Sequence, residues 1–131
     1  MRKLTVDLRP GEYAVARLHS TDAVPAALLA PGDGALVSVT RTGEELSVVC
    51  PVDSAPDGAR VEAGWRLLTV RGPLAFTLTG IMAALSNELA AAGVSLFALS
   101  TYDTDHLLVR ADDLDRAVAA LREAGHEVPG V

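Results

Sequence analysis

The chain has 131 residues, 50% of them hydrophobic, and a formal net charge of −6. This length allows one or two small domains with a buried core. The acidic balance argues against binding to nucleic acid, because phosphates need a basic patch. Lys3 is the only lysine, which leaves no polybasic segment for a membrane surface.

Two further features of the sequence limit the class of protein. The single cysteine, Cys50, excludes an internal disulfide and a cysteine-rich metal site. The first residues, MRKLTVDL, lack the apolar core of a signal peptide, and no segment reaches the roughly 20 apolar residues of a membrane helix. We therefore expect a cytoplasmic protein with no metal or cofactor, which binds neither membranes nor nucleic acid.

The first half of the chain has the pattern of a mostly β structure. Alternation of polar and apolar residues and the intervening turn residues predict strands over 3–8, 13–18, 35–41 and 45–50. Asp22 is placed to cap a short helix over 24–29. Residues 51–64 hold two prolines and two glycines without apolar periodicity, which is typical of a linker.

The second half predicts the order β-α-β-β-α, with a short last strand beginning at Glu127. The predicted strands and helices cover 65–71, 77–92, 94–101, 106–110 and a final helix that Asp112 caps and Gly125 ends. The first half repeats this plan with a reduced helix. The fold class is therefore α+β, with two related modules over 1–60 and 61–131.

The strand over 94–101 is apolar on both faces. One face carries Leu96 and Ala98, and the other carries Phe97 and Leu99. A sheet with one face in water should alternate between apolar and polar side chains. We therefore expect the second face to be covered, by the other module or by a second copy of the chain.

The segment RGPLAFTLTGI, residues 71–81, joins a strand to the start of a helix. The first turn of a helix presents unpaired N–H groups that receive a carboxylate well. Gly80 would let a ligand approach the backbone there. The alternative is that Gly80 only allows the helix to pack closely against a strand.

The segment STYDTD, residues 100–105, is a polar turn between two apolar strands. The carboxylate of Asp105 could pair with an ammonium group. The alternative is a turn cap, because Asp and Thr often bind local backbone. If this turn faces the helix start, the two segments together match the carboxylate and the ammonium group of an α-amino acid.

These segments, GPLAFTLTGI and STYDTD followed by HLLV, resemble the CASTOR-type tandem ACT-domain proteins, which include small bacterial amino-acid-binding proteins. The resemblance extends over nearly the whole chain, with ELSVVCP fitting a degenerate first module. It implies two ferredoxin-like βαββαβ modules and a ligand held between modules. It also implies ligand contacts from Thr79, Gly80, Ile81, Thr101, Tyr102 and Asp105 on one side, and from Ser95 and Leu96 of the partner subunit on the other.

The chain departs from the arginine-binding members of that family at one position. Leu78 stands where those members carry an acidic residue, and a leucine cannot pair with a guanidinium. The resemblance therefore implies a smaller or apolar amino acid in place of arginine.

Three classes of function compete. The first is a non-enzymatic amino-acid-binding regulatory protein that forms a homodimer. The second is a ligand-free interaction module that acts by docking to a partner protein. The third, an enzyme, would use Asp103 or Asp105 as a base, but the sequence places no nucleophile or anion-binding arginine near them, so we expect a non-enzyme.

Overall fold

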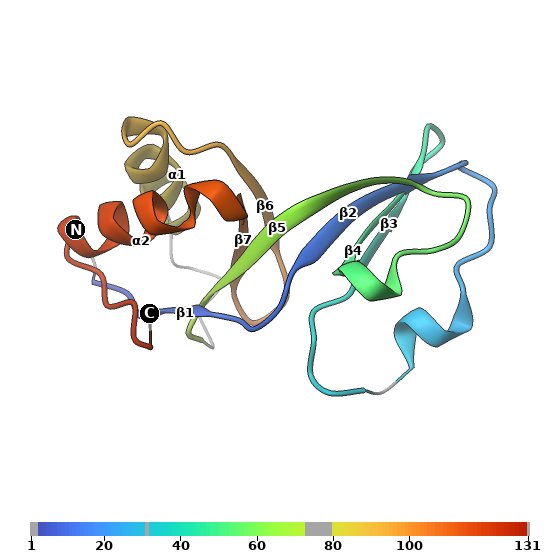
Figure 1. The fold of residues 1–131 in the computed structure, drawn as a ribbon, viewed down its shortest axis with the longest axis horizontal. Helices are drawn as coiled ribbons and strands as arrows, with labels where there is room; N and C mark the ends of the chain where they lie inside the picture. Colours follow the sequence, from blue (N-terminus) through green and yellow to red (C-terminus); the bar gives the residue numbers. More distant parts are fainter. Residues whose placement is uncertain (1–2, 31, 73–79, 131) are drawn as a thin grey trace. The chain divides into compact units, whose positions relative to one another are not determined.

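The computed structural model describes residues 3–30, 32–72 and 80–130 (Figure 1). The chain divides into two compact units. We call residues Gly11–Trp65 the N-terminal unit, and residues Met1–Pro10 with Arg66–Val131 the C-terminal unit. This division differs from the predicted boundary after residue 60, because the first ten residues belong with the last part of the chain.

The C-terminal unit has four neighbouring strands in the order β1-β5-β7-β6. The bounds are Val6–Leu8 for β1, Arg60–Val70 for β5, Leu96–Ser100 for β6 and Asp105–Arg110 for β7. Strand β1 runs antiparallel to the end of β5, with Val6 opposite Val70. The sequence predicted a short last strand beginning at Glu127. The structure has an isolated bridge between Thr5 and Glu127 there, and β1 is the strand that pairs with the end of β5.

Helices α1 (Ile81–Ala91) and α2 (Leu114–Glu123) lie side by side in this unit (Figure 1). Their buried residues Leu85, Leu89, Ala117, Val118 and Leu121 form one core with Val6, Leu68, Val70, Leu107 and Val109. The strand residues in this cluster alternate along β5 and β7, so the helices cover a single face of the sheet. This arrangement confirms the predicted α+β fold class.

The N-terminal unit is an antiparallel sheet in the order β3-β4-β2-β5, which includes the first part of β5. Its strands are β2 (Tyr13–Leu18), β3 (Ser38–Arg41) and β4 (Leu46–Pro51). The 3-10 helix η1 (Ala26–Leu29) confirms the reduced helix, and a second one, η2, spans Val52–Ser54. The core of this unit is Ala16, Leu18, Leu28, Leu46, Val48 and Cys50.

The predicted linker over 51–64 is wrong for its last five residues. Strand β5 begins at Arg60, and Val61 and Glu62 pair with Ala16 and Val15 of β2. The register of this pairing shifts between Tyr13 and Val15, close to Gly64, whose φ is 85°. A glycine with positive φ is typical of a β-bulge, so this glycine accounts for the shift in register within the continuous strand β5.

The two predicted helix caps are also wrong. Asp22 does not cap η1; its carboxylate accepts a hydrogen bond from the backbone N–H of His19. Asp112 lies in a 3-10 turn, Ala111–Asp113, and α2 begins after Asp113 without a side-chain cap. Aspartate favours turns as well as caps, because its short side chain reaches local backbone in both.

A buried polar pair lies on the face of the C-terminal sheet opposite the helices. The hydroxyl of Thr69 and Nδ1 of His106 are 3.0 Å apart, and both residues are buried. Burial lowers the pKa of His106, and the positive charge of Arg9 lowers it further, against a smaller opposite effect of Asp105. His106 is therefore neutral in the folded chain at neutral pH.

Val6→Ala tests whether β1 is part of the C-terminal core. The side chain of Val6 is fully buried, so the loss of two methyl groups should lower the free energy of unfolding by about 2 kcal/mol. Val61→Ala, at a residue 42% exposed on β5, is the control and should cost less than about 0.5 kcal/mol. Urea denaturation measures both, and equal effects would contradict the placement of β1.

His106 gives a second prediction, on pH. Because its pKa is lower in the folded chain, the unfolded chain binds more protons below the ordinary histidine pKa of about 6.5. Stability should fall as the pH drops from 7 towards 5, by at most about 1.4 kcal/mol per pH unit for this group. His106→Gln should flatten that slope, and His19→Gln, at an exposed histidine, should retain it. An unchanged slope in His106→Gln would refute the assignment.

Candidate functional site

The polar turn between β6 and β7 is organised around the carboxylate of Asp105. The hydroxyl of Ser100 donates a hydrogen bond of 2.5 Å to Oδ1 of Asp105. The backbone N–H of Thr101 donates to the carbonyl of Thr104 at 2.8 Å and closes the turn. Within the described part of the chain, Oδ2 of Asp105 has no partner, so this half-buried carboxylate retains an acceptor for a ligand.

Thr104 fixes this turn to the end of β5. Its hydroxyl donates a hydrogen bond of 2.5 Å to the carbonyl oxygen of Val70, the last residue of that strand. From Val70 the chain continues towards Gly80 and helix α1. The contact therefore connects the carboxylate-bearing turn to the strand that leads to the helix start.

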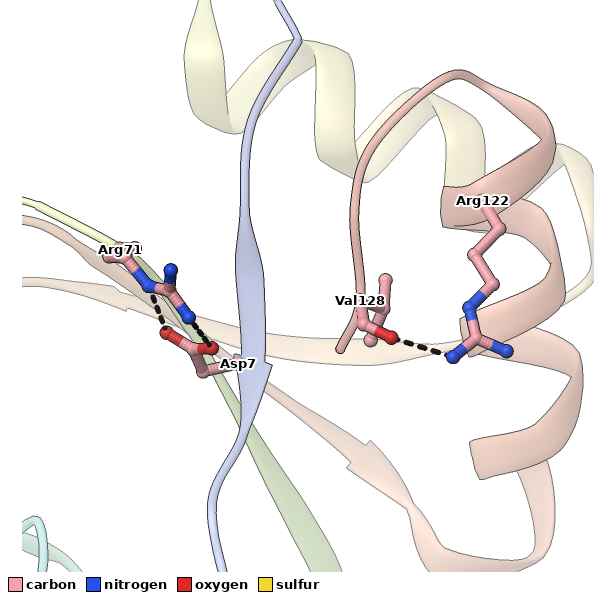
Figure 2. A network of polar contacts seen from close by, with 4 residues as sticks. All are labelled: Asp7, Arg71, Arg122 and Val128. Carbon is pink, nitrogen blue, oxygen red and sulfur yellow. Dashed lines mark hydrogen bonds and ion pairs between the residues drawn. The ribbon is translucent and has the colours of Figure 1, made fainter. Parts of the chain in front are cut away.

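The end of β5 is also held from the side of β1. The guanidinium of Arg71 donates two hydrogen bonds to Asp7, of 3.0 Å from Nε and 2.6 Å from a terminal nitrogen (Figure 2). These hydrogen bonds hold the pKa of Asp7 below its ordinary value. Both oxygens of Asp7 are thus occupied, and this carboxylate is not a candidate for ligand binding.

The start of α1 contains three residues of the predicted site. Gly80 precedes the helix with φ 77° and is exposed. Among the described residues, chain neighbours apart, no heavy atom lies within 4 Å of the position of a Cβ atom. The left-handed backbone conformation is by itself a sufficient reason for glycine at this position. Ile81 packs half-buried against the core. Thr79, and Leu78 with it, lie outside the described residues.

The remaining predicted site residues differ in how accessible they are. Thr101 is exposed, and its hydroxyl donates to the carbonyl of Thr104 at 3.3 Å. The side chain of Tyr102 is 79% exposed. Ser95 is exposed just before β6, but Leu96 packs half-buried against the helix-covered core. A ligand contact at Leu96 would therefore involve its backbone on the edge strand more than its side chain.

Sequence reasoning missed Thr104 and the pair formed by Asp7 and Arg71. Thr104 was part of the quoted turn, but nothing in its spacing indicates a hydrogen bond to a residue 34 positions earlier. In the described residues, no group of three or more His, Cys, Asp or Glu side chains could hold a metal ion. Nor does any helix in those ranges have the length and apolarity needed to cross a membrane.

The comparisons with protein families match the two halves separately. Residues 60–123 match the model of the ACT domain. Residues 11–58 match a separate model that describes an N-terminal domain. The boundary between these matches lies close to the boundary between the two units.

Several known proteins are similar to this chain. A crystal structure of a protein from Agobacterium tumefaciens is 39% identical, covers 98% of this chain and 93% of its own, and superimposes with a TM-score of 0.87. The aspartate kinase of Synechocystis shares the fold at 20% identity and a TM-score of 0.68, over 97% of this chain and 28% of the kinase.

The curated relatives match over a shorter region. The human protein named cytosolic arginine sensor for mTORC1 subunit 1 is 37% identical over 59 residues, which is 44% of this chain and 18% of the human protein. This chain thus covers less than a fifth of the length of that sensor. Residues 60–123 form an ACT domain, and the chain belongs to the same family as the Agobacterium tumefaciens protein.

Proposed function

We propose that this chain is a cytoplasmic, non-enzymatic regulatory protein that binds an amino acid at an interface between ACT modules. The observation that carries the proposal is the hydrogen bond from Thr104 to Val70, which joins the turn containing Asp105 to the strand leading into α1. One segment offers a carboxylate oxygen for an ammonium group. The other offers unpaired N–H groups at a helix start for a carboxylate.

The relatives support an amino-acid ligand. The human relative is named an arginine sensor, and structural neighbours include aspartate kinases, which act on an amino acid. The regulatory subunit of aspartate kinase from Thermus thermophilus covers 95% of this chain with a TM-score of 0.65. Because Leu78 cannot pair with a guanidinium, we propose an amino acid smaller or more apolar than arginine.

A homodimer is part of the proposal. Strand β6 is an edge strand of the sheet, and Phe97 and Leu99 on it are only half-buried in the single chain. An edge strand with apolar side chains invites pairing with another chain. A second copy there would place its residues 95 and 96 beside the site.

A second candidate is a ligand-free module that dimerises and docks to a partner protein. The bond from Ser100 to Asp105 favours it, because this bond also fits a turn that simply satisfies itself. The two candidates differ in one measurable respect, which is whether an amino acid stabilises the fold.

A thermal-shift screen of the twenty amino acids distinguishes the two candidates. At 100 times its dissociation constant, a ligand stabilises the folded state by about 2.7 kcal/mol. For a domain of this size the midpoint should then rise by several degrees. If no amino acid raises the midpoint, the docking module is the correct function.

Asp105→Ala tests the role of the carboxylate, and Ser100→Ala is its matched control. Both substitutions remove the hydrogen bond between the two side chains, but only the first removes the ligand's acceptor. Asp105→Ala should abolish the ligand-induced shift, and Ser100→Ala should retain most of it. Dimer mass by light scattering should be unchanged in both. Loss of the shift in both variants alike would assign Asp105 a purely structural role.

Thr104→Val tests the attachment of the turn to β5. Valine keeps the shape of threonine but removes the donor to Val70, so the free energy of unfolding should fall by about 1 kcal/mol. The amino-acid affinity should fall as well, because the turn is no longer held at the end of β5. Titration calorimetry measures this affinity, and an unchanged value would separate the turn's position from ligand binding.

A further inference from the structure

The N-terminal unit contains an open groove beside η1 that the proposed amino-acid site does not use. Its volume is about 660 Å³, and its apolar lining includes Leu18, Ala23, Pro25, Leu28, Ala55 and Pro56. A second hollow of about 730 Å³ shares Ala27, Leu28 and Ser54 with the first. Both hollows are therefore bordered by η1.

Among the described residues that line the two hollows, only acidic side chains carry charge. Asp22 and Asp57 line the first, and Asp33 and Asp53 line the second, with no lysine or arginine in either set. Arg41, which contacts this region, donates to the backbone carbonyls of Ser20 and Asp22 and is not part of the lining.

The four carboxylates differ in how they are used. Asp22 and Asp33 accept hydrogen bonds from the backbone N–H groups of His19 and Ala35. Asp53 and Asp57 are exposed, and within the described ranges their carboxylates have no hydrogen bond or ion pair. These two are thus available to an incoming cation.

The apolar part of the groove is also incompletely covered. Leu29 lines the second hollow, and 62% of its surface is exposed to solvent. A site for a small molecule encloses most of its ligand's surface, whereas this groove is open. The groove therefore suits a segment of polypeptide more than a small molecule.

We propose that this groove docks a segment of a partner protein that carries bulky apolar side chains flanked by lysine or arginine. The apolar side chains would fill the hollows and cover Leu29. The flanking cations would pair with Asp53 and Asp57. The inference is independent of the amino-acid site, which involves residues of the C-terminal unit.

Fluorescence anisotropy with labelled synthetic peptides tests the inference on the full chain. The panel has peptides of about twelve residues with two leucines at spacings of two, three or four, flanked by lysines. Two control series replace the lysines with glutamates or the leucines with serines. At least one lysine–leucine peptide should bind, and its two controls should bind at least about tenfold more weakly. Its affinity should fall as salt rises from about 50 to about 500 mM.

Variants locate the binding on the surface. Asp57→Lys should weaken the lysine–leucine peptide by about fivefold or more, because an attractive pair becomes repulsive. Leu29→Ser should weaken it to a similar extent by removing apolar contact. Glu123→Lys makes the same charge change at an exposed residue of the C-terminal unit and should leave the affinity unchanged. Unchanged thermal midpoints of all three variants establish that they are folded.

Three results would overturn the inference. The first is that no lysine–leucine peptide of the panel binds, or that the glutamate series binds equally well. The second is full affinity in both Asp57→Lys and Leu29→Ser. The third is a change in oligomeric mass in Leu29→Ser, measured by light scattering, which would assign the groove to contact between copies of the chain.

Discussion

The C-terminal unit depends on a strand supplied by the opposite end of the sequence. Val6 is fully buried in its core, and backbone bonds join Arg71 to Thr5 and Val6 to Glu127 at 2.8 Å each. Without β1, the end of β5 would expose its backbone groups and one side of the helix-covered core. Buried backbone groups must be paired, so the first residues are as necessary to the ACT domain as its own helices.

The same contacts explain why the candidate site lies at a well-defined place. The end of β5 is held by Asp7 on one side and by Thr104 on the other. A ligand site gains affinity when its groups are held in place before binding, because less ordering is then needed. The turn with Asp105 has this support, since it is closed by its own backbone and attached to a strand within the sheet.

Local sequence patterns predicted most elements of the C-terminal unit, and long-range pairing accounts for what they missed. The spacing of Leu85 and Leu89 indicated a helix because the period of a helix appears within a few residues. The place of β1 is different, since a short alternating segment does not specify which sheet it joins. The same limit applies to the site: composition identified the turn and Asp105, but the pair of Asp7 and Arg71 joins residues 64 positions apart.

The carboxylates of this acidic chain differ in their remaining capacity for hydrogen bonds, and that difference is the basis of the separate roles that we propose for them. Asp7 accepts from Arg71 through both oxygens, so it stabilises β5 and has no acceptor for a ligand. Asp105 accepts one bond from a neutral hydroxyl, and within the described residues its second oxygen has no partner, so we propose it as the acceptor for an ammonium group. In the part of the chain that the structure describes, the carboxylates of Asp53 and Asp57 have no partner and are exposed, which suits the transient pairing that we propose for them. The net charge of −6 therefore includes one carboxylate that stabilises the sheet and others to which we propose ligand-binding and partner-binding roles.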